Sequence, residues 1–149
     1  KIGVPKEIKN HEYRVGLTPA SVRELTSRGH EVLVQTGAGA AIGLTDEEYV
    51  AAGAKIASDA ASIFATAEMI VKVKEPQPQE CAMLRPGQIL YTYLHLAPDP
   101  EQTAALIKSG AICIAYETIT GPGGGLPPVI HDAPAPQGRP VPTEERVGG

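Results

Sequence analysis

Short apolar segments rich in β-branched residues alternate with segments of helical periodicity along most of the chain. Because β-branched and alternating apolar residues favour strands, we expect six strands. The predicted strands are residues 1–5, 30–35, 54–57, 68–74, 88–94 and 111–116. These lengths are typical of strands in a compact domain.

Start and stop signals place helices between the predicted strands. A capping residue followed by a proline, or by an acid or amide three residues later, marks a helix start. A glycine marks a helix end. These signals predict starts at Thr18, Thr45 and Asp99 and ends at Gly29, Gly53 and Gly110. Residues 58–67 have the spacing of a further helix, with Ile63 and Phe64 on its apolar face.

Regular alternation of strands and helices with short loops predicts βαβ units and a parallel sheet. Right-handed crossovers would place helices on both faces of that sheet. The expected fold class is therefore α/β, with a doubly wound, mostly parallel sheet of the Rossmann-like or flavodoxin-like kind. In such sheets, ligands bind beyond the carboxyl ends of the strands, so residues that follow strands are the first candidates for chemistry.

Glycine and proline divide the chain into two parts. They make up 16 of residues 1–120 but 14 of the 29 residues from 121 to 149. Since proline removes backbone donors, the second part is unsuited to a long helix or a central strand. We therefore expect one packed domain, residues 1–120, followed by an irregular Pro/Gly-rich tail or arm, residues 121–149.

Charge and apolar content limit the functional classes. The formal net charge is -4, and 42% of the residues are hydrophobic. The acidic balance and the lack of a basic cluster argue against a nucleic-acid partner. No segment approaches the roughly 20 apolar residues of a membrane span, and no secretory signal is visible. Because Cys81 and Cys113 are far apart, without a CxxC spacing, we expect a cytoplasmic protein without structural disulfides.

Three side chains with useful chemistry follow predicted strands. Arg14 lies in the loop after the first strand, and His95 directly follows the fifth. Lys74 ends the fourth strand, with Lys72 two residues earlier on the same face. Arg and Lys can grip a small carboxylate, and a histidine beside them can exchange a proton near neutral pH. The pattern thus predicts a small-carboxylate site, although cations at strand ends are usually only solvated.

Two glycine-rich segments resemble nucleotide-binding loops without their full pattern. Residues 37–43 have the spacing GxGxxxG, with Ile42 in place of the third glycine of a dinucleotide loop. Residues 121–125 lack the Lys-Ser/Thr pair of a P-loop. We therefore expect no nucleotide site at residues 37–43, and a turn or a flexible link at residues 121–125.

Acids and histidines elsewhere give weaker signals. Four glutamates lie near strand ends, namely Glu7, Glu12, Glu75 and Glu117. One of them could orient Lys74 or His95, but solvated acids at the rim of the sheet are the expectation. The histidines show no metal-binding spacing, and no Gly-x-Ser-x-Gly motif is present. We expect neither a metal site nor a serine or cysteine nucleophile.

Several stretches together carry a family resemblance. They are KIGVPKEIKNHEYRVGLTP, HEVLVQTGAG, TDEEYVAAGAKI, IVKVKEPQP, YTYLHLAPDP and AYETIT, and they cover about residues 1–127. In this order they resemble the N-terminal substrate domain of alanine dehydrogenase, with IVKVKEP and YTYLHLA as the most specific pair. The alpha subunit of proton-translocating transhydrogenase has a similar start but resembles the chain less around YTYLHLA.

The resemblance implies a reaction and assigns roles to the candidate residues. Members of the family convert L-alanine, NAD and water to pyruvate, ammonia and NADH. By resemblance, Arg14 and Lys74 would bind the substrate carboxylate, and Lys74 would also bond the C2 oxygen or nitrogen. His95 would be the acid–base group. NAD is the cofactor of the full-length family, and no metal is implied.

The last 22 residues, 128–149, depart from the family pattern. The dinucleotide fingerprint of the NAD-binding domain is not found in this sequence. We therefore expect a truncated substrate domain that is inactive alone and binds no cofactor tightly. The alternatives are a non-catalytic module that binds 2-oxo acids or partners, the substrate half of a split enzyme, or a transhydrogenase-like subunit. Exposed apolar surface or the tail would then support a homo-oligomer.

Overall fold

The computed structural model of the 149-residue chain describes residues 1–124. One compact unit spans Lys1–Tyr116, and a second begins at Glu117. Most of the expected Pro/Gly-rich arm, from residue 125 on, lies outside the described residues. The turn expected at Gly121 is confirmed as far as Gly124, whose N–H donates to the carbonyl of Gly121 at 3.0 Å.

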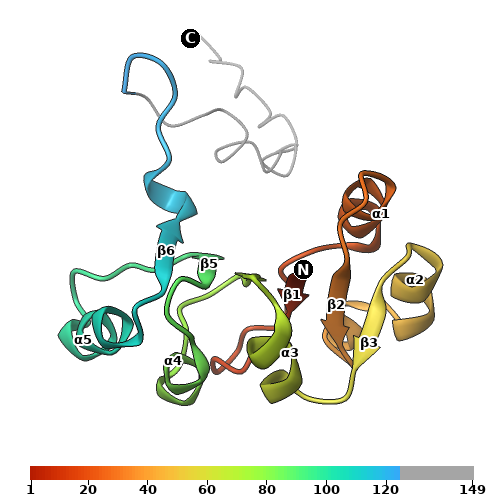
Figure 1. Ribbon diagram of the computed structural model, residues 1–149, viewed down its shortest axis with the longest axis horizontal. Helices are drawn as coiled ribbons and strands as arrows, with labels where there is room; N and C mark the ends of the chain where they lie inside the picture. The colour runs from red at the N-terminus through yellow and green to blue at the C-terminus, as the bar shows by residue number, and fades with distance from the viewer. Residues whose placement is uncertain (125–149) are drawn as a thin grey trace, which may run out of the picture. The chain divides into compact units, whose positions relative to one another are not determined.

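Six strands in the first unit form one sheet in the order β3-β2-β1-β4-β5-β6 (Figure 1). They are β1 Ile2–Val4, β2 Val32–Gln35, β3 Lys55–Ala57, β4 Met69–Val71, β5 Ile89–Thr92 and β6 Ile112–Ala115. All five pairings are parallel. The order is that of doubly wound folds: successive strands are added towards one edge from β1 to β3, and towards the other edge from β4 to β6. The predicted fold class is therefore confirmed.

Helices begin at the three predicted capping residues, Thr18, Thr45 and Asp99. They are α1 Pro19–Ser27, α2 Asp46–Ala51, α3 Ala60–Thr66, α4 Pro78–Met83 and α5 Pro100–Ser109, with short 3₁₀ turns at η1 Ala40–Ile42 and η2 Tyr116–Thr118. At α2, Thr45 and Glu48 form the predicted reciprocal capping box. The side chains of Thr18 and Asp99 cap α1 and α5 in the same way, by accepting a backbone N–H from the first turn.

Helix α4 was not predicted, and the sequence analysis leaves residues 75–87 without a helix. Its N-cap residue is Gln77, which is not among the usual capping residues. The side chain of Glu80 satisfies the orphan N–H of Gln77 at 2.9 Å instead. The Gln-Pro-x-Glu spacing is thus a start signal that could have been found.

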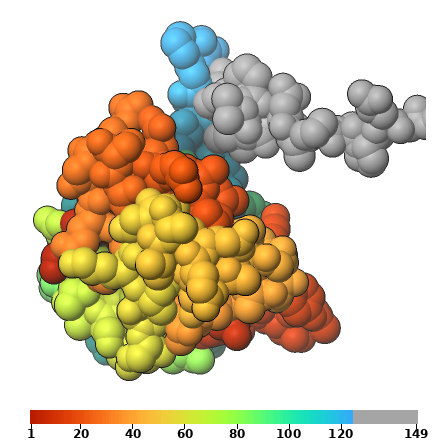
Figure 2. Space-filling view, turned by 90° about the vertical axis from the view of Figure 1, so that its right-hand side faces the viewer, coloured from red at the N-terminus to blue at the C-terminus, as the bar shows by residue number. Residues whose placement is uncertain are grey.

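Each face of the sheet has its own hydrophobic core. The core under α1 and α2 contains Val4, Val15, Val22, Val32, Val34, Ala38, Tyr49, Ala52 and Ala54. The core under α3, α4 and α5 contains Ile63, Phe64, Ala67, Ile70, Cys81, Leu84, Leu90, Leu94 and Leu106. Viewed from the side of α2, the segments from α1 to β3 form one closely packed surface (Figure 2). Helices on both faces are therefore confirmed.

Two apolar side chains on the edge strand β6 are exposed to solvent. Ile112 is 54% exposed and Ile114 is 37% exposed. Among the described residues, no helix is both long and apolar enough to cross a membrane.

The close packing of α3 on β1 generates a first prediction. A Cβ added at Gly3 would lie 2.4 Å from Cγ2 of Ile63 and 2.8 Å from Cβ of Ala67. Overpacking of this kind typically costs about 1–3 kcal/mol. We expect Gly3→Ala to lower the free energy of unfolding by that amount in denaturant titrations of the 149-residue chain.

The matched test is a double-mutant cycle with Ile63→Ala. Ile63→Ala removes the atom that the new Cβ would meet, so the double variant should lose less stability than the sum of the two single variants. Strictly additive losses would contradict the proposed contact.

Candidate active site

The three candidate residues lie at the carboxyl edge of the parallel sheet. The loop that carries Arg14 follows β1, Lys74 lies three residues after the end of β4, and His95 lies three residues after the end of β5. Strands β1, β4 and β5 are consecutive neighbours in the sheet. The crevice between β1 and β4 is the switch point at which doubly wound folds bind ligands.

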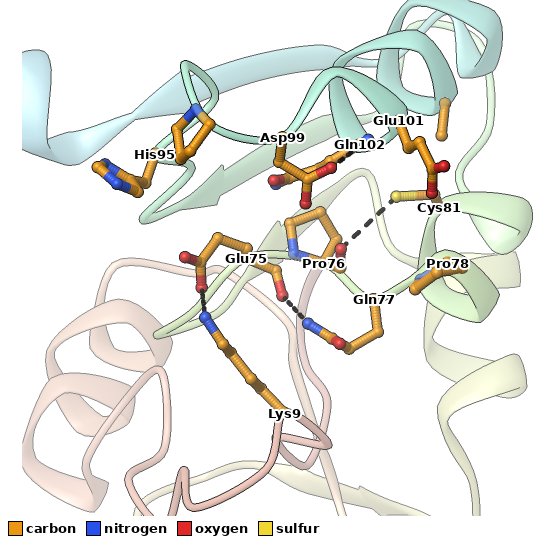
Figure 3. Close-up of a pocket in the computed structure, with 12 residues that line it drawn as sticks. Lys9, Glu75, Pro76, Gln77, Pro78, Cys81, His95, Asp99, Glu101 and Gln102 are labelled. Carbon is orange, nitrogen blue, oxygen red and sulfur yellow. Dashed lines mark hydrogen bonds and ion pairs between the residues drawn. The ribbon is translucent and has the colours of Figure 1, made fainter.

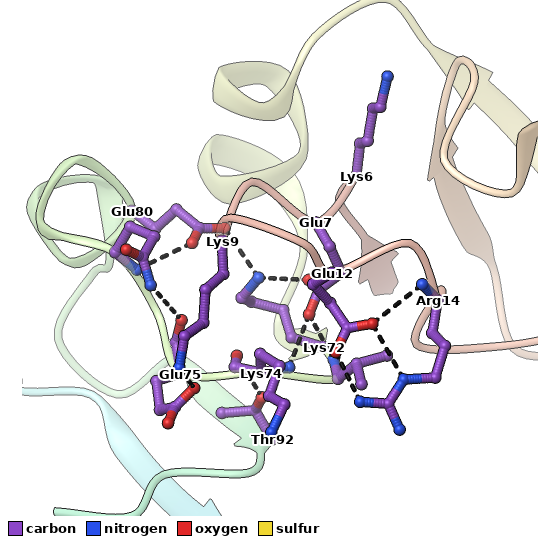
Figure 4. A network of polar contacts seen from close by, with 12 residues as sticks. Lys6, Glu7, Lys9, Glu12, Arg14, Lys72, Lys74, Glu75, Glu80 and Thr92 are labelled. Atoms are coloured by element: carbon purple, nitrogen blue, oxygen red, sulfur yellow. Dashed lines mark hydrogen bonds and ion pairs between the residues drawn. The ribbon is translucent and has the colours of Figure 1, made fainter. Parts of the chain in front are cut away.

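A buried carboxylate, that of Glu7, occupies this switch point (Figure 4). Its Oε1 accepts hydrogen bonds from the backbone N–H groups of Val73 at 2.8 Å and Lys74 at 2.6 Å. Its Oε2 accepts a hydrogen bond from Nζ of Lys72. Glu7 is only 7% exposed, so the expectation of a solvated rim acid is wrong for this residue.

The same contacts correct the predicted length of the fourth strand. The sequence pattern extends that strand to Lys74, but β4 ends at Val71. Val73 and Lys74 direct their N–H groups to Glu7 rather than along a strand ladder. A carboxylate that lies 66 residues away in the chain therefore terminates the strand.

Lys72 belongs to the buried network rather than to the open site. Its side chain is 1% exposed, and its Nζ lies 3.0 Å from Oε2 of Glu80, an ion-pair contact without hydrogen-bond geometry. Burial raises the pKa of Glu80, and the charge of Lys72 opposes that rise. Because two carboxylates already surround Lys72, its ammonium is not available to a ligand.

Lys74 and His95 meet on the ring of Tyr93. Nζ of Lys74 lies 4.5 Å from the ring centroid, which is a cation–π contact. The imidazole of His95 stacks on the same ring, with centroids 5.7 Å apart and planes inclined by 15°. His95 adopts a left-handed backbone conformation with φ of 44°, unusual for a residue other than glycine. The sequence analysis missed Tyr93, because an aromatic residue in a strand is ordinary.

Arg14 is held by a two-pronged pair with Glu12. Its Nε and one terminal nitrogen donate to the two carboxylate oxygens at 2.9 and 2.6 Å. The pKa of Glu12 is lowered to about 2, mainly by this hydrogen bonding and to a smaller extent by the positive charge of Lys74. Glu12 is thus a partner of Arg14 with a side chain 6% exposed, and the prediction of a solvated acid is wrong here as well.

Two separate hollows are lined by His95 and by Arg14, and Lys74 lines neither of them. A pocket of about 510 Å³ runs between α4 and α5, with His95 at one end and Cys81 at the other (Figure 3). Its lining includes an ion pair of 2.7 Å between Lys9 and Glu75. A hollow of about 300 Å³ lies beside Arg14. Either space is ample for a three-carbon acid.

The described residues offer no metal cluster and no pyrophosphate cradle. Within residues 1–124, no group of three or more His, Cys, Asp or Glu side chains could hold a metal ion. In the glycine loop after β2, the carboxylate of Asp46 accepts from the N–H of Gly37 at 2.9 Å and the hydroxyl of Thr36 at 2.6 Å. An acid therefore occupies the donors that a phosphate would need, and its charge would repel a phosphate. This part of the chain does not fit NAD.

The cysteines are also unsuited to catalysis. Burial raises the pKa of the Cys81 thiol to about 11 and also raises that of Cys113. Since the thiolate is the nucleophilic form, neither residue is an activated nucleophile at neutral pH.

The strand order β3-β2-β1-β4-β5-β6 defines a class, that of doubly wound parallel α/β domains. The family model described as alanine dehydrogenase/PNT, N-terminal domain, matches residues 3–129. The chain belongs to this family. The resemblance found from the sequence is therefore confirmed.

Individual relatives agree with the family assignment. The chain is 59% identical over 127 residues to alanine dehydrogenase of Halomonas elongata, which covers 85% of this chain and 34% of the relative. It is 54% identical over 119 residues to alanine dehydrogenase of Bacillus subtilis, covering 80% of this chain and 31% of the relative. The chain thus spans about a third of the length of the curated relatives it matches.

Solved structures show the same similarity. An L-alanine dehydrogenase superposes with a TM-score of 0.81 at 50% identity, covering 84% of this chain and 34% of that one. A transhydrogenase from Sinorhizobium meliloti superposes with a TM-score of 0.74 at 31% identity, covering 79% and 35%. The alanine dehydrogenase is the better match in both respects.

The pair of Arg14 with Glu12 predicts a low titration midpoint. The carboxyl ¹³C signal of Glu12 should titrate near pH 2 rather than near the ordinary 4.5. Because the folded pKa lies below the unfolded one, the stability that the pair contributes is present above about pH 4.5 and is lost as the pH falls towards 2.

The control for this titration is Arg14→Gln. It removes the donors and should return the midpoint of Glu12 towards 4.5. A midpoint near 4.5 in the unmodified chain would contradict the pairing.

Proposed function

We propose that this domain binds L-alanine and pyruvate as the substrate-binding part of an NAD-linked alanine dehydrogenase. The observation that carries the proposal is the meeting of Lys74 and His95 on Tyr93, at the same sheet edge as Arg14. Membership of the alanine dehydrogenase family supports it.

In this proposal, Arg14 and Lys74 hold the substrate carboxylate. The guanidinium of Arg14 uses Nε and one terminal nitrogen for Glu12, which leaves its other terminal nitrogen to face a ligand. Glu12 holds the guanidinium plane in a fixed direction. Lys74 presents its ammonium beside Tyr93 and can bond both the carboxylate and the oxygen or nitrogen on C2. Two cations at one edge of the sheet attract an anion more strongly than either would alone.

His95 is the proposed proton carrier. Conversion of L-alanine and water to pyruvate and ammonia requires protons to leave the amino group and the attacking water. Once the hydride has left C2, the imidazole of His95 can take a proton from the water that adds there and return it to the departing nitrogen. NAD, when bound by the complete enzyme, supplies the acceptor for the hydride of C2.

A second candidate is a non-catalytic interaction module, which could be a homo-oligomer. The observation that favours it is the exposure of Ile112 and Ile114 on the edge strand β6. Exposed apolar side chains on a sheet edge favour self-association. A concentration-independent monomer in gel filtration would count against this candidate, whereas pyruvate binding would favour the first.

A cytoplasmic location fits the proposed metabolic role. Both cysteines, Cys81 and Cys113, are free thiols, as is usual in a reducing compartment.

Pyruvate titration of the isotope-labelled 149-residue chain tests the proposed function. We expect amide shifts at Arg14, Lys74 and His95, and a Kd raised about tenfold or more by either Arg14→Gln or Lys74→Gln. The reason is that a hydrogen bond to a charged group contributes about 1.5–3 kcal/mol.

The matched control is Arg28→Gln. Arg28 forms a similar close pair, with Glu24 at 2.7 Å, but on exposed helix surface. It should leave the Kd unchanged. A dispersed spectrum that does not respond to pyruvate would exclude the proposed binding role for this chain.

A further inference from the structure

We propose that Glu7 is a positioning residue for Lys74, because its buried carboxylate fixes the backbone from which the lysine side chain extends. The substrate side of this inference rests on the proposed function of Lys74. The expectation from sequence, a solvated acid, gave Glu7 no role.

The first step is the anchoring of the peptide groups around Lys74. The N–H groups of Val73 and Lys74 both donate to Oε1 of Glu7. On the other side, the hydroxyl of Thr92 donates to the carbonyl of Lys74 at 2.8 Å, and the hydroxyl of Tyr116 donates to the carbonyl of Val73 at 2.6 Å. Both peptide groups that flank the Cα of Lys74 are therefore held, although this segment belongs to no strand.

A fixed backbone on both sides of Lys74 limits where its ammonium group can lie. A lysine side chain has four rotatable bonds and reaches a wide region when its backbone moves. With the backbone held, the stem of Lys74 can keep its Nζ 4.5 Å from the Tyr93 centroid. Tyr93 also carries His95. The position of Lys74 relative to His95 therefore depends on the Glu7 contacts.

The negative charge of Glu7 is balanced by Lys72. A carboxylate this close would weaken the attraction of Lys74 for an anion if it carried an uncompensated charge. Lys72 donates to the other oxygen of Glu7, and both side chains are at most 2% exposed. Glu7 can thus act as a strong acceptor for two N–H groups while its charge is balanced from behind. A neutral glutamine at position 7 would present an NH₂ group to the ammonium of Lys72. It therefore cannot accept from Val73, Lys74 and Lys72 at the same time.

Glu80 provides a matched comparison. It is as deeply buried as Glu7 and contacts the same Lys72 at 3.0 Å. Its other oxygen accepts from the N–H of Gln77, which an amide oxygen can also do. Glu80→Gln therefore alters the same buried charge cluster but leaves the peptide groups of Lys74 untouched.

The experiment uses the labelled 149-residue chain and the variants Glu7→Gln, Glu80→Gln and Thr92→Val. One readout needs no ligand, namely the nuclear Overhauser contacts between the side chain of Lys74 and the ring of Tyr93. The other is the Kd for pyruvate. We expect Glu7→Gln to lose the Lys74–Tyr93 contacts and to raise the Kd about tenfold or more, with a spectrum that stays dispersed. Glu80→Gln should keep the contacts and change the Kd less than about threefold.

Thr92→Val covers the case in which Glu7→Gln fails to fold. It removes only the hydroxyl that holds the carbonyl of Lys74, and should weaken the same contacts and raise the Kd by a few fold. The proposal is overturned if Glu7→Gln folds and leaves the Lys74–Tyr93 contacts and the Kd unchanged. If Glu7→Gln does not fold, the same result in Thr92→Val overturns it. Equal losses in folded Glu7→Gln and Glu80→Gln also overturn it, because they would indicate a general packing effect.

Failure of the proposed function would look different. If the unmodified chain binds no pyruvate, the substrate role of Lys74 is wrong. Loss of the Lys74–Tyr93 contacts in Glu7→Gln alone would then still support Glu7 as the group that sets the position of Lys74.

Discussion

The N–H groups of Val73 and Lys74, just after β4, have no partner in a neighbouring strand and need another acceptor. The candidate site is arranged around the group that accepts from them. In an open parallel sheet, the connections that follow the two strands at the switch point leave to opposite faces of the sheet, and a crevice opens between them. Dinucleotide-binding folds place the phosphates of the ligand near such a crevice. Here the chain supplies its own anion, the carboxylate of Glu7. Lys72 is buried against that carboxylate as its counter-ion, and in our proposal the same carboxylate sets the position of Lys74.

Much of the fold could be predicted because its signals are local. Thr18, Thr45 and Asp99 cap their helices through bonds that span three residues, so a short stretch of sequence contains all the chemistry involved. The end of β4 could not be predicted in this way. Its cause is an acceptor 66 residues away, and no window of neighbouring residues contains both partners. Helix α4 lies between these cases, since its signal is local but its capping residue is uncommon.

In the candidate site as well, residues marked by local position could be predicted and residues that depend on distant partners could not. The rule that ligands bind at the carboxyl edge led to Arg14, Lys74 and His95, and the structure places all three there. Their roles stay proposals. Nothing in the residue pattern separates Glu7 and Glu12 from ordinary surface acids, because burial of a carboxylate depends on which distant groups pair with it. Tyr93 was passed over because strands commonly contain aromatic residues.

The central place of β1 in the sheet has a consequence for the order of assembly during synthesis. Gly3 pairs with Leu33 on one side and with Ile70 on the other. The first pairing closes a loop about half as long, and its partner leaves the ribosome first. A β1–α1–β2 unit can therefore form early, with one flank of β1 still bare. The surroundings of Glu7 wait for Lys72 and Glu80, so a nascent chain can form the first strand pairing before the carboxylate of Glu7 has its partners.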